Sequence, residues 1–210
     1  MKNVVLFIIV LLLAVDCRKS RINQSDQNST EIFPNKVGDT WVYLVNDTSF
    51  TFQTPLTIVQ YNMTISVIDS VQLAGGIKAN VWVYNSPAGN DTNYVFKHGD
   101  TISFASNRAY YGNIVRQYII PLKLHDSWEY SSNSVRHVTV DSQLNIIVGQ
   151  NHFDNTFHIL GNPGRPDEII GLDEWVKDNV GVVRRYVNAS GTTNPLKHLT
   201  SWSLISYHLE

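Results

Sequence analysis

Three residues with metal-binding side chains lie close together in the second half of the chain: His152, Asp154 and His158. Alternation along one extended strand would place all three on its polar face. At about 3.3 Å per residue the two histidines would be roughly 20 Å apart, too far to bind one ion. His152 and Asp154, about 7 Å apart, make a poor site unless another strand contributes. We therefore expect a hydrated face and no metal site.

Two adjacent arginines, Arg184 and Arg185, form a second candidate. On a strand, neighbouring side chains point to opposite faces, so one of the two is expected to face inward. An inward guanidinium needs a carboxylate or a ligand anion as its partner. Glu174 and Asp178 lie nearby in the sequence. A structural ion pair is the favoured interpretation, and an anion-binding site is the alternative.

Sequence motifs of common enzymes are absent. The sequence contains no phosphate loop, dinucleotide fingerprint, nucleophile elbow or zinc-binding HEXXH helix. Its acidic residues are scattered, so the pattern does not pair two of them for hydrolysis. A formal net charge of −2 without a basic run argues against a nucleic-acid partner. We expect no catalytic residue and no cofactor.

The single cysteine, Cys17, follows an export signal. Lys2 precedes an apolar run over residues 4–15, about half the ~20 residues that a helix needs to cross a bilayer. A sole cysteine cannot form an internal disulfide. Residues 13–17 (Leu-Ala-Val-Asp-Cys) resemble a bacterial lipobox, whose cysteine is diacylated, although Asp16 stands where Gly, Ala or Ser is usual. The alternatives are an ordinary signal peptide cut elsewhere and an uncleaved anchor.

The sequence therefore predicts three parts. Residues 1–16 are expected to be a signal peptide, and residues 17–31 a lipidated flexible tether, because that stretch is polar and aperiodic. Residues 32–210 are expected to form a single β-rich domain. A chain of 210 residues with 43% hydrophobic residues can bury one core.

Hydrophobic alternation with a period of two marks the strands. In residues 56–71, apolar side chains at odd positions alternate with polar ones. In residues 134–149 the apolar side chains, Leu144 among them, are at even positions, and residues 117–120 are one of the shorter candidate strands. This pattern is typical of antiparallel strands with one buried face. No segment has the pattern of an amphipathic helix. We expect an all-β fold of about ten antiparallel strands in a twisted meander or half-open barrel.

An internal repeat underlies this pattern. Residues 34–43 and 121–130 share the motif P-x-K-[VL]-x-D-[ST]-W-x-Y, which predicts two similar halves at about residues 34–115 and 121–208. Proline and aspartate favour a turn before a strand. The tryptophan and tyrosine of each motif would then face the same side and bury a large apolar area. We expect these aromatic residues in the core; a sugar-stacking platform is the alternative.

The chain also resembles a known group of proteins. Its opening at residues 38–43 (Gly-Asp-Thr-Trp-Val-Tyr), its hairpin at 148–157 and its closing segment at 175–184 resemble exported Bacteroidetes lipoproteins of unknown function. That group shows a G-x-x-W-x-Y opening, a G-T-F-x-N-based hairpin and a G-V-G-L-V-type ending. This sequence has Asn151-His152-Phe153 in place of Gly-Thr-Phe. The resemblance implies a half-open barrel and an envelope location, and it implies no activity.

These features predict a non-enzymatic binding or scaffold protein on the bacterial cell envelope, anchored to the membrane through Cys17. Arg18, rather than an acidic residue, follows the cysteine, which favours the outer membrane. One alternative is a carrier of an acyl chain or other apolar ligand, for which Tyr61, Met63 and Ile65 would line a tunnel. Another is a glycan-binding or glycan-hydrolysing surface protein. Whether the partner is a protein, a glycan or a lipid stays open.

Overall fold

The computed structural model describes residues 33–50, 56–108, 114–131, 134–161, 168–191 and 197–210. The segments expected to be a signal peptide and a tether, with Cys17 between them, lie outside these residues. The described part has twelve strands where the sequence suggested about ten, and its one helical element is the short turn η1 (Ala74–Gly76). The strands are β1 (Thr40–Phe50), β2 (Thr57–Gln72), β3 (Lys78–Ser86), β4 (Gly89–His98), β5 (Thr101–Ala105), β6 (Ile114–Ile119), β7 (Ser127–Ser131), β8 (Ser134–Val148), β9 (Asn151–Gly161), β10 (Glu168–Lys177), β11 (Gly181–Gly191) and β12 (Lys197–His208).

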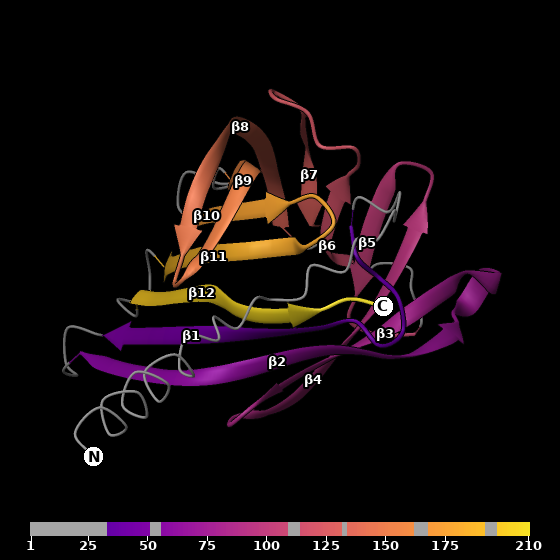
Figure 1. Cartoon of the computed structure of the whole chain (residues 1–210), viewed down its shortest axis with the longest axis horizontal. Coiled ribbons are helices and arrows are strands. Elements are labelled where there is room, and N and C mark those ends of the chain that lie inside the picture. The colour runs from indigo at the N-terminus through magenta and orange to yellow at the C-terminus, as the bar shows by residue number, and fades with distance from the viewer. Residues whose placement is uncertain (1–32, 51–55, 109–113, 132–133, 162–167, 192–196) are drawn as a thin grey trace, which may run out of the picture.

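All twelve strands belong to one antiparallel sheet. Its order is β6-β5-β4-β3-β2-β1-β12-β11-β10-β9-β8-β7, so two meanders meet where β1 pairs with β12 (Figure 1). The two outer strands, β6 and β7, also approach each other, because Nε1 of Trp128 donates a 2.8 Å hydrogen bond to the carbonyl of Gln117. The sheet is therefore a nearly closed barrel, which confirms the expected all-β class. None of the described residues forms a helix long and apolar enough to cross a membrane.

In the middle of β2, the residues that the alternation predicts to face the core do so. Met63 and Ile65 are buried, whereas Val59, on the same face, is 50% exposed. Val59 pairs with Asp47 near the hairpin end of β1 and β2, beyond the reach of the core. In β8, Leu144 was expected inside but is 38% exposed. Two register shifts in the pairing of β8 with β9 interrupt the alternation around it.

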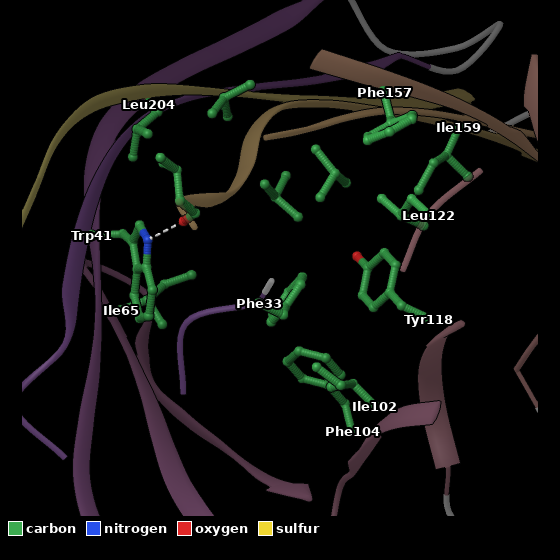
Figure 2. Packing of buried hydrophobic residues seen from close by; sticks show 14 of the residues in the cluster. Phe33, Trp41, Ile65, Ile102, Phe104, Tyr118, Leu122, Phe157, Ile159 and Leu204 are labelled. Carbon is green, nitrogen blue, oxygen red and sulfur yellow. Dashed lines mark hydrogen bonds between the residues drawn. The ribbon is translucent and has the colours of Figure 1, made fainter. Parts of the chain in front are cut away.

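The barrel interior is largely filled by aromatic side chains. Phe33, at the start of the described chain, lies in the middle of the core cluster, between Trp41 and Tyr118 (Figure 2). Its ring is 5.2 Å from that of Tyr118 and 6.0 Å from that of Phe104. The aromatic residues of both motifs are buried, as expected: Trp41, Tyr43, Trp128 and Tyr130. They offer no exposed platform on which a sugar could stack.

The two motif segments make the same backbone hydrogen bonds. The amide of Gly38 donates to Val67, whose own amide donates to Asp39, at 2.9 Å in each case. In the second segment His125 donates to Val140 at 2.7 Å, and Val140 donates to Asp126 at 2.9 Å. Gly38 (φ 105°) and His125 (φ 69°) both have left-handed backbone. Each motif therefore forms a turn before a strand, as expected; a duplication of the halves stays a prediction.

Candidate ligand pocket

The histidines singled out by the sequence lie on the outer face of β9 and are not brought together. His152 contacts Asp154 (Nδ1 to Oδ1, 3.4 Å), and both side chains are more than half exposed. His158 lies between two carboxylates, with Nδ1 2.7 Å from Asp141 and Nε2 3.2 Å from Asp173. Within the part of the chain that the structure describes, no group of three His, Cys, Asp or Glu side chains could hold a metal ion.

Arg184 and Arg185 point to opposite faces of β11, as alternation predicts. The guanidinium of Arg184 lies over the rings of Trp175 and Tyr186, 5.4 Å and 4.9 Å from their centroids. Arg185 points into the barrel, where its Nε is 3.1 Å from Oε1 of Glu174. The expected ion pair therefore exists, and Glu174 rather than Asp178 is the partner.

Glu174, on β10, is fully buried and is held by two tyrosines from distant strands. The hydroxyl of Tyr118 on β6 donates to Oε2, and that of Tyr130 on β7 donates to Oε1, each at 2.9 Å. Burial raises the pKa of both tyrosines, and the negative charge of Glu174 raises it further. Both phenols therefore stay protonated and act as donors to the carboxylate.

A second guanidinium, that of the buried Arg116 on β6, lies beside the same carboxylate. Its Nη1 is 4.0 Å from Oε1 of Glu174, and its Nη2 donates a 3.1 Å hydrogen bond to the hydroxyl of Tyr84. It also stacks over Phe104, 4.0 Å from the ring centroid. Burial alone would lower the pKa of Arg116. The neighbouring acidic groups (Tyr118, Tyr84, Tyr130 and Glu174) have the larger effect, so the pKa is above its usual value. Two guanidinium groups thus share one carboxylate.

A cavity of about 440 Å³ opens beside this cluster. Met63, Tyr84 and Arg116 are its buried lining residues, whereas Asn90 and Asp91, from the start of β4, are exposed. The lining comprises apolar, aromatic, amide and charged side chains: Met63, Tyr84, Ser86, Ala88, Gly89, Asn90, Asp91, Asn93, Val115, Arg116, Arg185 and Trp202. Such a mixed lining can bind a small molecule and orient it through a few polar contacts.

Arg185 and Glu174 were among the candidates from the sequence, which did not choose between Arg184 and Arg185 or between Glu174 and Asp178, whereas Arg116 and Tyr118 were missed. The predicted strand at residues 117–120 began one residue too late to include Arg116. Started at Ile114, it would have placed Arg116 on the same face as Tyr118 and Ile120. A charged residue on an apolar face was the available signal. No local pattern shows that this face meets Glu174.

Comparisons with known proteins give no family for the chain. No protein-family model and no curated protein matches it. Three solved structures resemble it at low identity. A Bacteroides fragilis protein, described as exported and with a YmcC-like fold, is 13% identical, with a TM-score of 0.44 over 85% of this chain and 99% of that one. A protein from Parabacteroides distasonis, described as a lipoprotein, is 16% identical, with a TM-score of 0.36 over 87% of this chain and 100% of that one. A DUF1329 family protein from Desulfovibrio piger is 8% identical, with a TM-score of 0.24 over 83% of this chain and 87% of that one.

Proposed function

We propose that this protein is a lipid-anchored component of the bacterial cell envelope that binds a small ligand without transforming it. The observation that carries this proposal is the cavity of about 440 Å³, whose wall includes the buried side chains of Met63, Tyr84 and Arg116. Natural binding pockets are concave, partly apolar and lined by a few polar groups, and this cavity has that composition. The lipobox-like segment ending at Cys17 supports the anchor, and the outer membrane is the proposed location.

The filled interior favours a compact ligand over an acyl chain running through the barrel. Of the three residues considered for an apolar tunnel, Met63 lines the cavity. Ile65 is buried in the core cluster, and Tyr61 packs against that cluster from its edge. A long chain would need a continuous channel past Phe33, which lies at the centre of the packing (Figure 2).

The proposal is tested by filling the cavity. Val115 lines it and is half-buried, so Val115→Trp would place an indole in the ligand's space. Val59→Trp is the matched control, because Val59 is 50% exposed and lies outside the cavity. Both are made in the full chain, and the melting temperature is measured with and without a small-molecule extract of the host envelope.

A ligand that binds only the folded state raises the melting temperature, by several degrees at saturation. We expect this rise in the wild type and in Val59→Trp, and its loss in Val115→Trp. An extract that stabilises none of the three proteins, or Val115→Trp as much as the wild type, would overturn the proposed function.

A further inference from the structure

We infer that the pocket recognises a carboxylate group carried on a compact, partly apolar molecule. This inference rests on the proposed function, because it assigns a chemical class to the ligand of the same cavity. It is carried by three features of the wall: an excess of positive charge around the buried carboxylate of Glu174, a buried guanidinium N–H without an aligned acceptor, and an apolar and aromatic surface beside them.

The buried cluster has one more positive charge than negative charge. Arg116 and Arg185 each carry one, and Glu174 is the carboxylate between them. Asp91 also lines the cavity, but it is exposed, and its carboxylate accepts the amide of Thr92 at 2.8 Å. Buried charge is costly unless it is paired. A ligand with a single carboxylate would balance the cluster.

The hydrogen bonds of the cluster leave guanidinium donors available. Both oxygens of Glu174 accept hydrogen bonds from tyrosines. Nε of Arg185 is buried and, although it lies 3.1 Å from Glu174, has no aligned acceptor among the described residues. A guanidinium has five N–H donors in a planar fork, which matches the two oxygens of a carboxylate. Arg116 and Arg185 can therefore both donate to a ligand carboxylate.

The remaining lining indicates the body of the ligand. Met63 and Val115 offer apolar contacts, and the rings of Tyr84 and Trp202 add aromatic surface. Trp202 is already covered on one side by the guanidinium of Arg185, 4.8 Å from its ring centroid. An acidic sugar and a short fatty acid both combine a carboxylate with a body suited to this wall. Their shared chemistry is the carboxylate.

Matched pairs of probes separate charge from shape. Galacturonate against galactose, octanoate against octanamide, and benzoate against benzamide differ mainly in the charge. Binding is measured by calorimetry on the full chain carrying Cys17→Ser, which removes the site of acylation. We expect the acid of at least one pair to bind tenfold or more tightly than its neutral partner. The pair that shows this preference indicates whether the rest of the ligand is a sugar, an alkyl chain or an aromatic ring.

Three variants locate the effect. Arg185→Gln should abolish the preference for the acid, and Arg184→Gln, one residue away on the outer face, should preserve it. Because Arg185→Gln could also impair folding, Glu174→Gln provides a nearly isosteric second variant. It removes the competing carboxylate and should strengthen binding of the acid several-fold, with the neutral partner unchanged.

The outcomes separate the two proposals. Equal binding of acid and neutral partner in every pair, or no binding of any acid while the envelope extract still stabilises the wild type, overturns the carboxylate inference alone. A preference for the acid that survives in Arg185→Gln overturns it as well. If no acid binds and the extract does not stabilise the wild type, both the carboxylate inference and the proposed function are overturned.

Discussion

The indole Nε1 of Trp41 donates a 2.7 Å hydrogen bond to the backbone carbonyl of Val180, 139 residues further along the chain. Trp41 lies on β1, and Val180 lies in the turn between β10 and β11. The bond therefore joins the first meander to the second at the turn between β10 and β11. The ring of Trp41 also stacks on Trp82, with centroids 4.8 Å apart. One side chain thus contributes both packing and a buried polar contact.

Trp41→Ala should lower the free energy of unfolding by about 3–5 kcal/mol, the usual range for emptying a large aromatic site. Trp41→Phe should cost less, because it keeps an aromatic ring and loses the bond to Val180. Denaturant titration of the full chain measures both, with Val59→Ala as an exposed control. A wild-type midpoint for Trp41→Ala would mean that this side chain is not part of the core.

Glu174→Leu should destabilise the protein by about 3–5 kcal/mol, because it leaves two buried guanidinium groups without their shared carboxylate. Glu174→Gln should cost less, since the amide oxygen can still accept from a tyrosine. Glu129→Leu, on the exposed side of β7, is the matched control and should change stability by no more than about 0.5 kcal/mol. If Glu174→Leu and Glu129→Leu have equal effects, Glu174 does not stabilise the two guanidinium groups beside it.

Alternation along single strands predicted much of this architecture. It placed Met63 and Ile65 on the buried face of β2 and required one of Arg184 and Arg185 to face inward, because both follow directly from a period of two. It failed at Leu144, since a local shift in pairing is set by the partner strand rather than by the sequence of β8. Strand number and bounds were also only approximate.

The candidate site was predictable only in part. Arg185 and Glu174 lie on neighbouring strands of one hairpin, so a short sequence separation indicated their pairing. Tyr118 and Tyr130 reach Glu174 across 56 and 44 residues, through the near closure of the barrel. Closure depends on the packing of the whole sheet, which no local pattern encodes.

Labelled palmitate should be incorporated into the wild-type protein in its native host and not into Cys17→Ser. The reason is that the lone cysteine directly follows the apolar export segment. Ser20→Ala, in the expected tether, is a control that leaves the cysteine in place and should label normally. Equal labelling of the wild type and Cys17→Ser would exclude this anchor.

The two halves should depend on each other for stability. β1 and β12 pair along their whole length, so separating the halves would expose two long strand edges and an apolar face. A fragment ending at Asn113 should be insoluble or molten, and the full chain should unfold in one cooperative step. Two separable transitions, or a well-folded isolated half, would instead indicate independent domains.

The inward guanidinium of Arg185 is the group that we propose to bind the ligand carboxylate. Nitrogen-15 NMR of the arginine Nε–H groups, during titration of the full chain carrying Cys17→Ser with benzoate, tests this claim directly. The Arg185 signal should shift in a saturable way, while that of Arg184, the adjacent residue on the outer face, should stay in place; benzamide should move neither. Equal shifts of both signals, or benzoate binding that leaves Arg185 unmoved, would contradict the claim.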